Sequence, residues 1–113
     1  MFRVIIRVIV RLEEICVMTI TKTVNGNEAT LAIEGWLDTQ AAPELLTELN
    51  HLEDNIDHLV MDFSGLEYMS STGLRAVVVA HEKMKGNLVI KNASSRILKI
   101  FKTTGIDKFV KLV

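Results

Sequence analysis

Residues 60–75 read Val-Met-Asp-Phe-Ser-Gly-Leu-Glu-Tyr-Met-Ser-Ser-Thr-Gly-Leu-Arg. The apolar start of this stretch is typical of a strand, and Ser64-Gly65 predicts where that strand ends. We expect Asp62 and Gly65 to belong to turn structure. Three hydroxyl residues then stand directly before a run of helix-forming residues: Ser70, Ser71 and Thr72. The stretch therefore predicts a strand, a loop and a helix, with hydroxyl groups at the start of the helix.

The start of a helix suits hydroxyl side chains for two physical reasons. The first backbone N–H groups of a helix have no partner within it, so a Ser or Thr oxygen commonly caps them. The same N–H groups, together with the positive end of the helix dipole, stabilise a phosphate. The hydroxyl groups of residues 70–72 therefore cap the helix, carry a phosphate, or do both.

The composition is that of one globular domain. The chain has 113 residues, of which 49% are hydrophobic and 24% charged, enough to build a core. A net charge of −1 and scattered lysines give no reason to expect nucleic acid as a partner. The single cysteine, Cys16, has no partner for a disulfide, and the three histidines lack metal-ligand spacing. We expect a reduced, cytoplasmic protein without a metal ion or cofactor.

Residues 1–17 differ in character from the rest of the chain. Arg3, Arg7 and Arg11 recur every four residues among apolar, largely β-branched side chains. This pattern fits a helix with one basic stripe and equally fits a strand, and it is too short and too interrupted to span a membrane. Three interpretations stay open: an added packing element, a helix that binds a membrane surface or a partner, and translated upstream sequence before a start at Met18. We expect the domain proper to span residues 18–113.

From Met18 onward, strand and helix patterns alternate. Residues 19–24 and 29–33 alternate polar and apolar side chains around Asn25-Gly26, which predicts an antiparallel hairpin. Helices are predicted over about residues 40–52 and 72–85 and after Ser94 or Ser95, with strands over residues 58–62, 88–90 and 108–113. Because strands separated by helices usually pair in parallel, we predict an α/β fold in which helices cover a mixed sheet, in the order β-β-α-β-α-β-α-β.

The connection over residues 34–39 precedes the first predicted helix. Asp38 and Thr39 are the candidates to cap that helix, and Pro43 falls in its first turn, where its missing N–H does little harm. Parallel crossovers place successive strand-to-helix connections at the same edge of a sheet. We therefore expect this connection to lie beside the hydroxyl residues of the second helix.

Residues 62–75 resemble the signature of STAS domains, in particular that of the bacterial anti-sigma factor antagonists. In that family the pattern runs Asp-Leu-Ser, a few residues, an apolar pair, and then Asp-Ser-Ser/Thr-Gly-Leu. Two further segments, residues 34–45 and 100–107, are similar to the family's entry into the first helix and exit from the third. The resemblance covers residues 18–113 and implies a STAS domain with the fold predicted above.

The resemblance implies a phosphorylation switch. In such proteins the hydroxyl directly before Gly-Leu is phosphorylated by a partner that is both an anti-sigma factor and a serine/threonine kinase. The unphosphorylated antagonist binds that partner and frees the sigma factor, and a separate phosphatase removes the phosphate. By position, Thr72 is the acceptor, Ser71 is the alternative acceptor, and Gly73 is the close-packed residue that follows. Ser70 stands where the family usually has aspartate, which is the main departure from the pattern.

Motifs of independent enzymes are missing from the sequence, including the Gly-x-Ser-x-Gly elbow and the phosphate-binding glycine loops. We therefore expect a binding protein and not an enzyme, with no membrane or nucleic-acid partner. An alternative is a STAS subunit that is never phosphorylated and acts as a scaffold in a transporter or signalling complex. In either case the expected partner-binding residues surround the start of the second helix: Asp38, Thr39, Ser70, Ser71, Thr72, Gly73 and Arg75.

Overall fold

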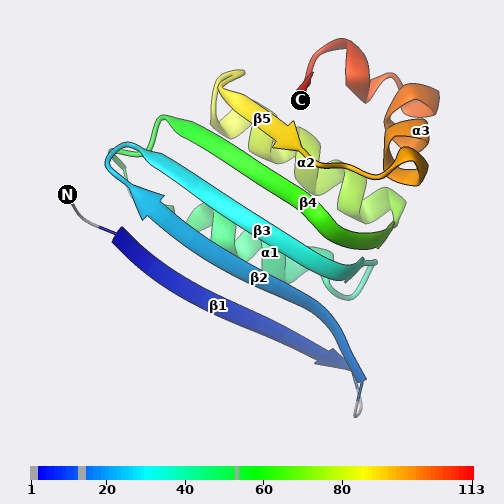
Figure 1. Ribbon diagram of the computed structural model, residues 1–113, viewed down its shortest axis with the longest axis horizontal. Helices are drawn as coiled ribbons and strands as arrows, with labels where there is room; N and C mark the ends of the chain where they lie inside the picture. Colours follow the sequence, from blue (N-terminus) through cyan, green and yellow to red (C-terminus); the bar gives the residue numbers. More distant parts are fainter. Residues whose placement is uncertain (1–2, 13–14, 53) are drawn as a thin grey trace.

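The computed structural model describes residues 3–12, 15–52 and 54–113, and in this part of the chain six strands form one sheet. The spatial order of the strands is β1-β2-β3-β4-β5-β6, the same as their order in the sequence (Figure 1). The strands are β1 (Arg3–Leu12), β2 (Ile15–Asn25), β3 (Glu28–Leu37), β4 (His58–Met69), β5 (Leu88–Lys91) and β6 (Lys111–Leu112). The helices are α1 (Ala42–Asn50), α2 (Ser71–Lys83) and α3 (Ser95–Thr104), followed by the short 3-10 helix η1 (Ile106–Lys108).

The sheet is mixed, as the alternation of strands and helices predicted. β1, β2 and β3 pair in an antiparallel manner, whereas β3, β4, β5 and β6 pair in parallel. In the hairpin between β2 and β3, Asn25 pairs with Glu28, so the two loop residues are Gly26 and Asn27. Gly26 has a φ of 65°, a left-handed conformation that costs glycine little. The α/β fold with a mixed sheet is confirmed.

One face of the sheet is covered by helices. Side chains along β3 and β4 alternate between buried and more exposed positions, as expected of strands with one covered face. Figure 1 looks onto the open face, with α1 and α2 behind the sheet. On the covered face Phe63 of β4 packs against Phe101 of α3, with ring centroids 6.3 Å apart. The largest fully buried side chains of the core are Phe63, Phe101, Met18, Ile20, Leu31, Ile33, Leu37, Leu45, Leu49, Leu59, Met61 and Leu88.

β3 and β4 are longer than the sequence pattern predicted. Residues 34–37 belong to β3 and residues 63–69 belong to β4, so assigning them to connections was wrong. The expectation that Asp62 and Gly65 form turn structure was wrong for the same reason, because both lie within β4. Two register shifts, between Ala32 and Glu34 and between Gly35 and Trp36, interrupt the pairing with β4. Such bulges break the period-two alternation that marks a strand in sequence, although the pairing continues beyond them.

The first helix also begins later than predicted. α1 starts at Ala42, and its N-cap residue, Ala41, makes no side-chain capping bond. Capping by Thr39 was therefore wrong. Asp38 does make capping bonds, but one turn before α1: its Oδ1 accepts hydrogen bonds from the backbone N–H groups of Gln40 (3.1 Å) and Ala41 (2.9 Å). Asp38 thus stabilises the turn before the helix, while Pro43 lies in the first turn as expected.

The C-terminal elements follow their local capping signals. Ser94 caps α3, since its Oγ accepts a hydrogen bond from the N–H of Ile97 at 3.3 Å. Gly105 ends α3 in the left-handed conformation, with a φ of 81°. The last strand is shorter than predicted, because η1 begins directly after Gly105 and only Lys111–Leu112 pairs with β5.

The backbone of Arg3–Leu12 forms a strand and not a helix. This strand, β1, pairs with β2 from Arg3 opposite Asn25 to Leu12 opposite Ile15. The helical interpretation of this segment was therefore wrong, whereas the strand alternative agrees with the structure. Residues 1, 2, 13 and 14 of the segment lie outside the described residues. Among the described residues, none of the helices has the length and apolar character needed to cross a membrane.

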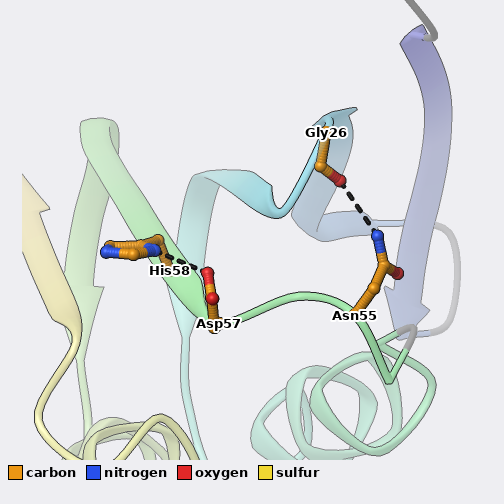
Figure 2. A network of polar contacts seen from close by, with 4 residues as sticks. All are labelled: Gly26, Asn55, Asp57 and His58. Atoms are coloured by element: carbon orange, nitrogen blue, oxygen red, sulfur yellow. Dashed lines mark hydrogen bonds and ion pairs between the residues drawn. The ribbon is translucent and has the colours of Figure 1, made fainter.

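The amino ends of β3 and β4 are tied together by the loop before β4. The side-chain amide of Asn55 donates to the carbonyl oxygen of Gly26 at 3.2 Å, and His58 Nδ1 lies 2.6 Å from Oδ1 of Asp57 (Figure 2). The N–H groups of Asp57 and His58 both donate to the carbonyl oxygen of Asn27. The hydrogen bond with His58 is the main cause that lowers the pKa of Asp57. These contacts stabilise the sheet at the amino ends of β3 and β4. The hydroxyl residues lie at the opposite edge, where the carboxyl ends of β3 and β4 meet.

Candidate functional site

Ser70 forms the corner between β4 and α2. Its backbone is extended, with a ψ of 173°, and its Oγ accepts a hydrogen bond from the N–H of Gly73 at 3.2 Å. The N–H of Ser70 donates to the carbonyl oxygen of Leu37 at 2.9 Å, which links the corner to the end of β3. Capping of the helix by one of the three hydroxyl residues is thus confirmed, and the residue is Ser70. The hydroxyl groups of Ser71 and Thr72 do not take part in this capping bond.

Ser71 and Thr72 occupy the first two positions of α2. Ser71 is exposed and Thr72 is partly buried. Within the described part of the chain, no hydrogen bond engages the hydroxyl group of either residue. Both positions lie in the first turn, where unpaired N–H groups and the helix dipole favour negative charge. A phosphate on Thr72 or Ser71 is therefore compatible with the helix.

Gly73 brings the start of α2 against the ends of two strands. A Cβ atom at this position would lie 2.8 Å from the carbonyl oxygen of Leu37 and 3.1 Å from Cγ of Met69. Contacts this short with backbone require movement, so any larger residue would push α2 away from the sheet. Gly73 is therefore close-packed, and its packing fixes how far the hydroxyl residues project from the sheet edge.

The connection between β3 and α1 lies beside this corner. Leu37 pairs with Met69, so the chain leaves β3 and β4 at the same level of the sheet. Asp38 is partly buried in its turn, and Thr39 is exposed. Arg75 lies one turn into α2 with its side chain exposed. The structure thus brings together the two predicted connections, while Arg75 belongs to the adjoining surface of the helix.

An exposed aromatic pair at the same edge was missed by sequence reasoning. Trp36 of β3 pairs with Tyr68 of β4, and their ring centroids lie 5.2 Å apart with an interplanar angle of 38°. Trp36 is 51% exposed and Tyr68 is 41% exposed. A signal was present in the sequence, because each aromatic residue stands two positions before a polar residue of a connection, Asp38 or Ser70. It went unrecognised because residues 34–39 and the end of β4 were assigned to loops.

The described histidines with side-chain contacts have partners other than Ser71 and Thr72. His58 contacts Asp57. The ring of His81 packs edge-on against the ring of Phe109, with the ring centroids 5.0 Å apart. In residues 3–12, 15–52 and 54–113, no histidine forms a hydrogen bond with Ser71 or Thr72. A hydrolase that uses either hydroxyl as a nucleophile would need such a partner.

Comparison with known proteins finds a relative in sequence and several solved structures of similar fold. The protein is 30% identical over 91 residues to the anti-sigma-B factor antagonist of Bacillus subtilis (strain 168). The aligned region covers 78% of this chain and 84% of that relative. A crystal structure of an anti-sigma factor antagonist from Mycobacterium paratuberculosis superposes with a TM-score of 0.76, at 22% identity over 84% of each chain. Unphosphorylated SpoIIAA, also an anti-sigma factor antagonist, gives a TM-score of 0.64 at 16% identity, covering 80% of this chain and 82% of SpoIIAA.

These solved structures share little sequence with the chain, so their likeness concerns the fold. It extends to the phosphorylated form of SpoIIAA, described as a Bacillus cell fate determinant, with a TM-score of 0.63 at 17% identity over 80% of this chain and 86% of that one. The family model for the STAS domain matches residues 19–113, which include both connections and the whole of α2. The motif in residues 62–75, the mixed sheet and the family model agree, and the chain belongs to the STAS domain family.

Proposed function

We propose that this protein is an anti-sigma factor antagonist that binds an anti-sigma factor with serine/threonine kinase activity. Binding takes place while Thr72 is unphosphorylated, and phosphorylation of Thr72 releases the partner. The observation that carries this proposal is the 30% identity to the anti-sigma-B factor antagonist, which extends over 84% of that relative. A separate phosphatase returns the protein to its binding form. The role is a cytoplasmic one, since it requires ATP and access to the transcription machinery.

The position of Thr72 supports a switch that acts at the interface. A phosphate adds a charge of about −1.5 to −2 at neutral pH and is stabilised at a helix start, so α2 keeps its structure. The same phosphate at the contact with a partner adds repulsion from nearby acidic groups and a desolvation cost. Phosphorylation therefore blocks binding without unfolding the antagonist. Ser71, which is more exposed, is the alternative acceptor.

Ser70 gives the alternative function its main support. It replaces the aspartate that the family usually has, and its Oγ makes the capping bond to the N–H of Gly73 without a negative charge. If the carboxylate normally orients the acceptor or the kinase, its absence favours a scaffold subunit that is not phosphorylated. The two functions share the binding surface around Asp38, Thr39 and the start of α2, and they differ in whether ATP changes the protein.

Intact-mass measurement separates the two functions. Wild type, Thr72→Ala and Ser71→Ala are incubated with ATP and the candidate anti-sigma kinase from the same genome. We expect wild type and Ser71→Ala to gain one phosphate and Thr72→Ala to gain none. If only Ser71→Ala fails to gain the phosphate, Ser71 and not Thr72 is the acceptor. An unchanged mass in a mixture where the two proteins still form a complex would contradict the switch and favour the scaffold.

A further inference from the structure

The aromatic pair projects from the sheet beside the proposed switch. Leu37 and Met69 are buried on the covered face, and neighbouring side chains of a strand point to opposite faces. Trp36 and Tyr68 therefore lie on the open face, one residue before the two strand ends against which Gly73 packs. Both residues are exposed in the free protein. Trp and Tyr are the residues that most often supply the energetic centre of a protein interface.

The neighbourhood of the pair is acidic. Glu34 lies two residues before Trp36 on β3. Glu67 is the extra residue of β4 at the register shift, because Gly35 pairs with Leu66 and Trp36 pairs with Tyr68, and such a bulge interrupts the alternation of faces. Both glutamates are exposed. Within the described residues neither carboxylate forms an ion pair or a hydrogen bond. Asp38 adds a third carboxylate two residues beyond Trp36. Negative charge beside the electron-rich faces of two aromatic rings selects for a cation, and a guanidinium group both stacks on such rings and pairs with carboxylates.

We propose that Trp36 and Tyr68, flanked by Glu34 and Glu67, bind an arginine-bearing surface of the anti-sigma factor. This inference rests on the proposed function and extends its interface from the start of α2 around the sheet edge onto the open face. The continuity is covalent, because Trp36 leads through Leu37 into Asp38 and Tyr68 leads through Met69 into Ser70. The partner therefore contacts both faces of the sheet at this edge.

Affinity measurements with paired variants test the energetic part of the proposal. We expect Trp36→Ala to weaken binding of the anti-sigma factor by about tenfold or more, as interface aromatic residues commonly do, and Tyr68→Ala to weaken it to a smaller extent. Phe109→Ala is the matched control, because Phe109 is 47% exposed and packs against His81. His81 lies ten residues after Ser71, at the other end of α2 and about 15 Å along the helix. The control should bind as wild type does.

Charge reversal tests the choice of partner chemistry. Glu34→Lys and Glu67→Lys place a cation beside the rings, so we expect each to weaken binding and the loss to shrink as salt is added. Glu82→Lys, an exposed position in the last turn of α2, makes the same change away from the aromatic pair. An equal effect of all three reversals would contradict a local arginine contact and indicate only a general attraction of net charge.

Fluorine NMR reads the contact in the folded wild-type protein. Trp36 is the single tryptophan, so 5-fluorotryptophan labels one position, and an unlabelled anti-sigma factor adds no signal. On complex formation we expect the resonance to shift and to lose its sensitivity to the exchange of H₂O for D₂O. Because this measurement needs no substitution, it tests whether Trp36 contacts the partner even if Trp36→Ala folds poorly.

The outcomes separate the two proposals. If Thr72→Glu loses the partner while Trp36→Ala binds as wild type and the fluorine signal is unmoved, the aromatic contact is overturned and the proposed function stands. If Thr72→Glu binds as tightly as wild type, the switch is overturned, and a protected fluorine signal would still support the aromatic contact. If wild type binds no anti-sigma factor of its genome, both are overturned.

Discussion

Asp62, within β4, and Asn92, directly after β5, join the two strands on the open side of the sheet. Oδ1 of Asp62 accepts hydrogen bonds from the N–H of Ser64 at 3.0 Å and from the side-chain amide of Asn92 at 3.2 Å. Partial burial raises the pKa of Asp62. The hydrogen bonds from Ser64 and Asn92, together with the charge of Lys91, lower the pKa by a larger amount. The net pKa of Asp62 lies below its ordinary value of 3.8.

A pH-dependent loss of stability follows for Asn92→Gly. Glycine tolerates the φ of 62° found at Asn92, so the variant removes the hydrogen bond without strain. We expect it to lower the free energy of unfolding by about 1 kcal/mol at neutral pH. Because the pKa of Asp62 is depressed in the folded state, this contribution is present above 3.8 and is lost as the pH falls below that value.

Urea unfolding of wild type and Asn92→Gly at neutral pH and at about pH 3 checks this expectation. The added flexibility of glycine in the unfolded chain is the same at both pH values, so it cancels from the comparison. The gap between the two proteins should shrink in acid. A gap of equal size at both pH values would contradict a contribution that depends on the ionised carboxylate of Asp62.

At the scale of an element, the start of α2 combines a structural cap with the proposed switch. Ser70→Ala removes the oxygen that accepts from the N–H of Gly73, so we expect a loss of about 1 kcal/mol, or about 4 °C in Tm. Ser70→Asp keeps an acceptor and adds negative charge near the positive end of the helix dipole, so its stability should equal or exceed that of wild type. Thermal unfolding monitored by circular dichroism measures both.

Ser71→Ala is the control for this pair, since its hydroxyl is exposed and makes no hydrogen bond within the described residues. Its Tm should stay close to that of wild type. Equal stability of Ser70→Ala and wild type would remove Ser70 from its capping role. The same proteins, incubated with the kinase, test whether an aspartate at position 70 speeds phosphorylation of Thr72.

The elements differ in how well their sequence predicted them. α3 was placed correctly at both ends, because Ser94 and Gly105 act through bonds to residues only a few positions away. β3 and β4 were cut short, because Gly35 and Gly65 resemble turn residues in sequence and lie in strands here. Whether such a glycine ends a strand depends on the strand that pairs with it, which a local pattern does not contain. The Trp36–Tyr68 contact depends on the same bulges and was missed with them, while the role of Thr72 stays a prediction.

At the scale of the whole molecule, the independence of residues 18–113 is open to a direct test. The pairing of β2 with β3 runs from Met18 opposite Gly35 to Asn25 opposite Glu28, and it lies entirely within residues 18–113. We predict that a chain starting at Met18 unfolds in a single cooperative transition in urea and keeps its affinity for the anti-sigma factor. The full-length chain is the reference. Loss of the cooperative transition would show instead that β1 is a required strand of the domain.

The sheet has the same strand order in space as in the sequence, and this bears on how it assembles. During synthesis the chain emerges from its amino end, and each new strand then meets a neighbour that is already present. No strand has to enter between two that have paired before it. The parallel pairs from β3 onward must still wait for the helix that connects them, which makes those steps slower than the closure of the first hairpins. Growth of the sheet can thus proceed in one direction, with the newest strand always forming its edge.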